Sequence, residues 1–248
     1  MMQAYIINSP AIEKISGTIK NYKQTRKSAN FIFTKNNKNT FGVIAVAAVL
    51  ADAPGLAVSS AASANAEEEA DYIEFDLDGR SVKGWVWRSP FVNGDIVDVI
   101  AERMDDHFEA YGIARPKDRI VALYPHCSRG RTAHWINALK WWFKGVTIML
   151  LFGTIFFGLG CVALSDTWYE TGTFLLDMMP AMALFFYPTF LLMTISLGWK
   201  WMSFVRVAER VFTAFGWDRA SDIDLKRRSK GTKTGADENG FGVFFFRY

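Results

Sequence analysis

The chain has 248 residues, a formal net charge of +3 and 21% charged residues, which is an ordinary composition for a folded protein. Its two cysteines exclude a disulfide framework and a four-ligand zinc site. The excess positive charge is concentrated near the N-terminus, so the composition does not indicate a protein that binds nucleic acid over its whole surface.

Residues 1–40 form a basic N-terminal region, with seven Lys or Arg against the single Glu13. This imbalance predicts contact with an anionic membrane surface. Apolar residues scattered among the basic ones predict one short helix within 16–34 and a strand at Asn30–Thr34.

Residues 41–66 are apolar and rich in alanine, and they end in Ala64-Asn65-Ala66, which imitates a signal-peptide cleavage site. Asp52 interrupts the apolar run after 11 residues. Cleavage or a full span here would also place basic flanks outside the cell, against the positive-inside rule. The preferred interpretation is an interfacial or re-entrant segment, or one packed on the membrane hairpin. A span and a signal peptide are the alternatives.

The pattern of residues 67–126 has a period of two, which indicates short strands. Ile73, Phe75 and Leu77 alternate with acidic residues, and Trp85 and Trp87 share a second face that we expect to lie in the core. The acidic exposed positions argue against nucleic acid as a ligand. Five strands in so short a segment predict a small antiparallel β-barrel, of SH3-like or oligonucleotide-binding (OB) type. They are expected at 73–77, 85–87, 96–101, 108–114 and 120–124.

The segment His126–Thr132 is the only candidate active site in the sequence. It resembles the phosphate loop of cysteine phosphatases, but Arg131 follows Cys127 by four positions instead of six, which is too short to surround a phosphate. His126, Cys127 and His134 match no zinc pattern. We therefore predict no enzymatic activity, no metal and no cofactor, and a polar corner with Arg129 and Arg131 facing lipid headgroups.

Two uncharged stretches, Gly145–Leu164 and Met178–Leu197, are each 20 residues long, which is the length of a membrane-spanning helix. A helix over Thr132–Phe143 is expected to run into the first span. The connector Ser165–Asp177 has three acidic and no basic residues, so the positive-inside rule places it outside and both chain ends in the cytoplasm. The residues predicted to lie at the membrane interface are Arg129, Arg131, Lys140, Trp141, Trp142, Lys144, Trp199, Lys200 and Trp201.

After the second span, apolar residues at helical spacing between Trp201 and Phe215 predict an amphipathic helix that packs on the barrel or on headgroups. The tail from residue 216 is basic and ends in the sequence GVFFFRY. Phe244, Phe245 and Phe246 are expected to add a strand to the barrel or to dock on a partner.

These observations predict an α+β membrane protein in four parts. Residues 1–66 are the basic region with its Ala-rich segment, and residues 67–126 are a small cytoplasmic β-module. Residues 127–215 contain the transmembrane hairpin, with spans 145–164 and 178–197, between amphipathic helices. Residues 216–248 are the basic C-terminal tail.

Four segments, EEEADYIEFDLDGRSVKGWVWRSPF, GIARPKDRIVALYPHCSRGR, AHWINALKWW and GVFFFRY, together with SGTIKNYKQTRKSANFIFT, resemble a family of bacterial membrane proteins named as candidate type VI secretion system effectors. The likeness covers nearly the whole chain. It implies a secretion setting but no catalytic residues.

The sequence therefore favours a bacterial inner-membrane protein that is a type VI effector acting at membranes. The alternatives are an immunity or accessory protein for a secreted toxin, and a membrane adaptor with no secretion role. The expected partners are the lipid bilayer and a type VI component or a cognate toxin or immunity protein, and not nucleic acid.

Overall fold

A computed structural model of the chain describes residues 12–29, 68–164, 168–235 and 237–248. The chain divides into two compact units, one made of Met1–Ala133 with Met202–Tyr248 and the other of His134–Trp201. The Ala-rich segment 41–66 and the expected strand Asn30–Thr34 lie outside the described residues, so what the sequence predicts for them stays a prediction.

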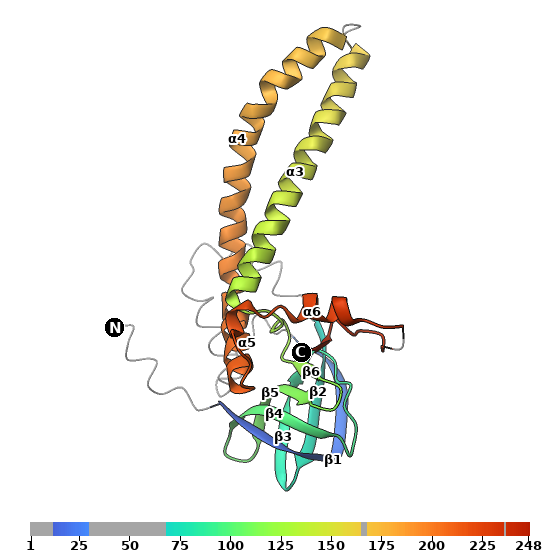
Figure 1. The fold of residues 1–248 in the computed structure, drawn as a ribbon, viewed down its shortest axis with the longest axis vertical. Coiled ribbons are helices and arrows are strands. Elements are labelled where there is room, and N and C mark those ends of the chain that lie inside the picture. Colours follow the sequence, from blue (N-terminus) through green and yellow to red (C-terminus); the bar gives the residue numbers. More distant parts are fainter. Residues whose placement is uncertain (1–11, 30–67, 165–167, 236) are drawn as a thin grey trace, which may run out of the picture. The chain divides into compact units, whose positions relative to one another are not determined.

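The first unit is built on a β-sheet, and the second consists of long helices (Figure 1). The strands are β1 (Ile12–Ala29), β2 (Glu68–Leu77), β3 (Arg80–Val86), β4 (Ile96–Arg103), β5 (Phe108–Arg115), β6 (Ile120–Leu123) and β7 (Phe245–Arg247). The helices are α3 (Arg131–Leu164), α4 (Trp168–Lys200), α5 (Met202–Ala214), α6 (Leu225–Thr232) and the 3₁₀ turn η2 (Ala220–Asp222).

Five strands close into a barrel. β1 pairs antiparallel with both β2 and β4, β2 pairs with β3, and β4 pairs with β5. A parallel pairing of β3 with β5 completes the ring. The predicted α+β fold with a five-stranded barrel is thus confirmed, but the ring contains one parallel pair and uses β1 in place of β6.

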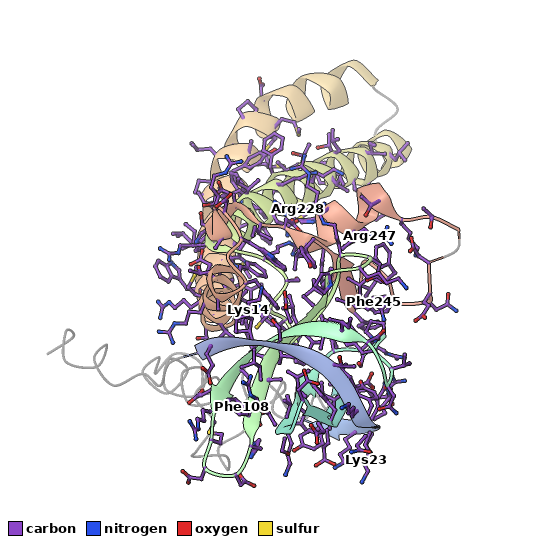
Figure 2. The ribbon with its side chains drawn as sticks, turned by 60° about the horizontal axis from the view of Figure 1, so that its bottom comes forward. Lys14, Lys23, Phe108, Arg228, Phe245 and Arg247 are labelled. Carbon is purple, nitrogen blue, oxygen red and sulfur yellow. The ribbon has the colours of Figure 1, made fainter. Side chains whose placement is uncertain are left out.

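β1 is a single long strand that bends as it passes from one side of the barrel to the other, between Lys14 and Lys23 in Figure 2. Its first half pairs with β4 and its second half with β2, and the register shifts between Lys20 and Lys23. Asn21 lies at this shift in the left-handed conformation, with φ 53°, which asparagine tolerates better than most residues. The short helix expected within 16–34 is therefore wrong.

The barrel core consists of the inward-facing apolar residues of its five strands. On β2, Ile73, Phe75 and Leu77 are buried and alternate with half-exposed polar residues, as the sequence pattern predicts. Their partners in the core include Ile15, Ile19, Val82, Val86, Val97, Val99, Ala101, Ala110 and Ile113.

β6 and β7 extend the sheet beyond the ring. β6 pairs antiparallel with β5 at Gly112–Arg115, and β7 then pairs antiparallel with β6. Phe245 and Phe246 are buried, and Phe245 belongs to the barrel core. Of the two alternatives for the terminal phenylalanines, the added strand is confirmed for Phe245 and Phe246, while Phe244 precedes it.

Helix α5 packs on the outer face of β5. This agrees with the first of the two predicted alternatives for the amphipathic helix, which was packing on the barrel. Gly112 makes the close approach possible, because a Cβ there would lie 3.0 Å from a methyl of Val211 and 3.2 Å from the ring of Phe215. The described residues after α5 include η2, α6 and β7. Asp224 caps α6 by accepting a hydrogen bond from the backbone N–H of Arg227 at 3.0 Å.

Candidate functional site

Helices α3 and α4 run side by side as a hairpin (Figure 1), and both are long and apolar enough to cross a membrane. Only 11% and 6% of the residues in their candidate spans are buried. Exposed apolar side chains of this number are expected of helices that face lipid, and they are unusual on the surface of a soluble protein. They include Leu151, Phe152, Ile155, Phe156 and Leu159 on α3, and Leu184, Phe185, Leu192, Met193 and Leu197 on α4.

Hydrogen bonds join the two helices of the hairpin. The indole N–H of Trp142 donates to the carbonyl oxygen of Tyr187 at 3.2 Å, and the Tyr187 hydroxyl lies 2.7 Å from the hydroxyl of Thr147. Nε2 of His134 lies 3.2 Å from the carbonyl oxygen of Gly198. Polar side chains that bond across two helices are satisfied within the hairpin, as a lipid environment requires. His134, considered above as a metal ligand, has this packing role.

Of the nine residues predicted at the membrane interface, seven lie in the unit of the hairpin, His134–Trp201, and Arg129 and Arg131 precede this unit. Lys140, Trp141, Lys144 and Trp199 are exposed on the hairpin, while Trp142, Lys200 and Trp201 are half-buried there. Arg129 is different, because its Nε donates to Asp224 at 3.0 Å. This ion pair joins the segment just before α3 to Asp224, the N-cap residue of α6. Arg129 therefore has a structural role.

The segment around Cys127 has no geometry for phosphate chemistry. Cys127 is buried, its thiol donates to the carbonyl oxygen of Phe204 at 3.5 Å, and burial raises its pKa far above the usual value. A thiol in such surroundings is a poor nucleophile. Arg131, the other half of the apparent motif, pairs with Glu209 at 2.9 Å. Within the described residues, no group of three His, Cys, Asp or Glu side chains could hold a metal ion.

Trp85 lies on the outer face of β3, and Trp87 directly follows the end of this strand. Both are half-exposed and outside the barrel core, so the expectation that they form the core is wrong. The inward positions of this strand are Val82, Gly84 and Val86, which are buried. Gly84 lies where β3 meets β5, and a Cβ at this position would be 2.5 Å from the carbonyl oxygen of Ala110. The barrel closes too tightly here for large side chains to point inward.

The outer face of β2 and β3 carries a half-exposed aromatic pair. Tyr72 and Trp85 are cross-strand partners, with ring centroids 5.0 Å apart. The ammonium group of Lys27 lies 5.1 Å from the centre of the Tyr72 ring. We call Lys27, Tyr72 and Trp85 the aromatic face.

Carboxylates surround the aromatic face. Burial, followed by the charges of Glu109, Glu74 and Asp106, raises the pKa of the Tyr72 hydroxyl. Burial also raises the pKa of Glu109, whose cross-strand partner on β4 is Glu102. Burial raises the pKa of Glu102 as well, although its carboxylate accepts a hydrogen bond from the Tyr111 hydroxyl at 2.9 Å. The charges of Glu109, Glu74 and Asp106 thus make the surroundings of the Tyr72 hydroxyl negative. The His107 ring contacts two of these carboxylates, Asp106 at 2.6 Å and Glu109 at 3.3 Å.

Trp87 is engaged by other parts of the same unit. Its ring lies 5.0 Å from the His126 ring and 5.5 Å from the Phe244 ring, and the ammonium group of Lys226 lies 5.0 Å from its centre. His126 also lies 2.8 Å from a carboxylate oxygen of Glu68, and burial lowers the pKa of this histidine. Tyr72 and Trp85 are half-exposed and lie together on the outer face of β2 and β3, which makes them the candidates for binding a ligand.

No protein-family model, curated protein or solved structure matches this chain.

Proposed function

We propose that this protein is a non-enzymatic binding module anchored in the bacterial inner membrane, and that the outer face of its barrel recruits a partner. The observation that carries the proposal is the half-exposed pair Tyr72 and Trp85. Smaller inward residues fill the barrel core, so these two rings are not needed to fill it. Large aromatic rings on a surface are typical of binding sites.

The barrel is of the OB type in this proposal. The strands follow the order β1-β2-β3-β5-β4 around the ring, and the ring closes with a parallel pairing of β3 and β5. Both features are characteristic of OB barrels, whereas SH3-like barrels close with antiparallel pairs. OB barrels commonly bind ligands on the face formed by their second and third strands. The aromatic face lies on the corresponding strands here. This support is an analogy between folds and does not identify the ligand.

The hairpin is the anchor, with the barrel on the cytoplasmic side. This orientation is supported by the basic residues that flank the spans and by the acidic connector between them. Both covalent connections of the hairpin lead to the barrel unit. A binding module in this arrangement would hold its partner at the membrane surface.

The partner that best fits the aromatic face is a basic segment of a protein. Tyr72 already accepts Lys27 at cation–π distance, and the surrounding carboxylates favour further positive charge. The same carboxylates would repel the phosphates of a nucleic acid.

Site-specific photocrosslinking in cells tests this function. A photoreactive phenylalanine analogue in place of Trp85 is expected to trap a discrete partner, and the same analogue in place of Val92, which is exposed elsewhere on the barrel, is not. Changing Glu74 and Glu109 to glutamine should reduce the yield at position 85. Crosslinks of equal yield at both positions, or a yield unaffected by the glutamine changes, would refute recruitment through the aromatic face.

The resemblance to candidate type VI effectors supports a second proposal, in which the protein acts in type VI secretion. As an effector it would act at membranes, and as an immunity or accessory protein it would bind a toxin. The exposed apolar hairpin favours a membrane site of action in both cases. Production in a bacterium without the system separates them. Growth arrest with membrane depolarisation is expected of an effector, while harmless production with rescue from a neighbouring toxin would exclude that role.

A further inference from the structure

A groove of about 630 Å³ lies along α5, and arginines dominate its lining. Arg206 and Arg210 are four residues apart, so they project from the same side of the helix. Arg131 contributes from the first residue of α3. All three arginines are exposed, and the other lining residues are Ile12, Glu209, Thr213 and Ala214.

Glu209 offsets only one of the three positive charges in this groove. One of its carboxylate oxygens accepts the backbone N–H of Arg131 at 2.7 Å, and the other accepts Nη2 of the same residue at 2.9 Å. Each oxygen thus accepts one hydrogen bond from Arg131. With three guanidinium groups and one carboxylate, the groove has an excess of positive charge, and it suits an anionic ligand.

Guanidinium groups bind phosphate oxygens with two parallel hydrogen bonds, which makes arginine the preferred residue for recognising phosphate. Residues 1–11, which directly precede Ile12 in the chain, contain no charged side chain and cannot supply the anion. The ligand class indicated by the groove is a phosphate ester or a similar anion.

The sequence position of the groove identifies the source of that phosphate. Arg206 follows Leu197, the end of the second span, by nine residues, and Arg131 precedes Gly145, the start of the first span, by fourteen. In helices these separations correspond to about 14 Å and about 21 Å. If the hairpin spans the membrane, as the proposed function states, the groove lies within reach of the cytoplasmic headgroups, which are anionic.

We propose that the groove formed by Arg131, Arg206 and Arg210 binds the phosphate of an anionic phospholipid headgroup. This inference rests on the membrane anchor of the proposed function. It adds a specific lipid site to that anchor, which differs from general attraction between a basic surface and a bilayer.

The test uses the full chain in neutral detergent micelles. Binding of dihexanoyl phosphatidylglycerol, dihexanoyl phosphatidylcholine and inorganic phosphate is measured for the wild type, for the double variant R206Q/R210Q and for R227Q/R228Q. The last variant removes two exposed arginines of α6, which lie outside the groove. Thermal unfolding of each variant checks that it is folded.

We expect the wild type to bind phosphatidylglycerol more tightly than phosphatidylcholine or inorganic phosphate. R206Q/R210Q should weaken phosphatidylglycerol binding about thirtyfold, since each basic residue near an anionic lipid contributes about 1 kcal/mol. R227Q/R228Q should weaken it by less than about threefold. Equal losses in both variants would show diffuse attraction instead of a site, and equal affinity for inorganic phosphate would show an anion site with no preference for lipid. Either result overturns the proposal.

Reporter fusions separate this inference from the proposed function. Fusions at Gly79 and Asp237 should report a cytoplasmic location, and a fusion within 167–171 a periplasmic one. A periplasmic signal from Gly79 would overturn the proposed orientation, whatever the micelle titration shows. A cytoplasmic signal combined with unchanged lipid binding in R206Q/R210Q would overturn the lipid site alone.

Discussion

Replacing Phe245 by alanine should destabilise the barrel by about 3–5 kcal/mol, because the change removes a large buried ring and leaves a cavity. Phe245 lies on β7 in the barrel core, is 4% exposed, and has its ring centroid 5.9 Å from that of Phe241. In thermal unfolding of the full chain in neutral detergent, this loss corresponds to a decrease in Tm of roughly 6–20 °C.

Val243→Ala is the matched control for this change. Val243 precedes β7 by two residues but is 49% exposed, so its truncation should change stability by less than about 0.5 kcal/mol. If both variants unfold at the same temperature, the C-terminal strand contributes little to the barrel. The terminal phenylalanines would then be available for a partner, which was the other alternative that the sequence left open.

The sequence predicted β2, β4, β5 and β6 well because their side chains follow the period of two, whereas the strand expected at 85–87 overlaps only the end of β3. Ile73, Phe75 and Leu77 alternate with charged residues, and turn residues separate the strands. It also predicted both long helices, because an uncharged stretch of about 20 residues is a strong signal that does not depend on tertiary contacts.

β1 could not be recognised from the same signal. Its buried residues Ile15 and Ile19 have the period of two only if Gly17 is counted between them, and without it their spacing of four resembles a helix. The register shift beyond Lys20 then breaks the alternation. A strand that is shared between two sides of a barrel is defined by its pairing with distant strands, which local periodicity does not contain.

The prediction places Trp85 in the core because it shares a face with Trp87, and the aromatic face is therefore missed. The signal that could have identified the inward face of β3 is Gly84, which lies between Val82 and Val86. Val82, Gly84 and Val86 also have a period of two, and Gly84 is needed for the close pairing with β5. The pairing of Tyr72 with Trp85 depends on the register of β2 and β3, which the short Asp78-Gly79 turn sets. The lipid groove depends on residues from α3 and α5 that are 75 or more positions apart.

Asp71 occupies an inward position of β2 at the end of the barrel core, and its carboxylate is fully buried. Oδ1 accepts two hydrogen bonds from the guanidinium of Arg26, at 2.8 and 2.9 Å. Oδ2 accepts the amide of Gln24 at 2.7 Å and the backbone N–H of Ser89 at 2.9 Å. The hydroxyl of Tyr22 contacts the hydroxyl of Ser89, and burial raises the pKa of Tyr22 to about 12. One carboxylate thus ties β1, β2 and the segment after β3 together.

Changing Asp71 to asparagine should therefore destabilise the barrel by about 2–4 kcal/mol. The amide has nearly the same size, but its NH₂ group faces donors where the carboxylate accepted hydrogen bonds, and the charge of Arg26 loses its partner. Arg26 is 39% exposed, so water offsets part of that loss. Asp98→Asn is the control, because Asp98 pairs with Lys14 at 2.8 Å near the surface and should lose less than about 1 kcal/mol. Thermal unfolding of both variants in neutral detergent measures the difference, and equal losses would show that Asp71 contributes no more than a surface ion pair.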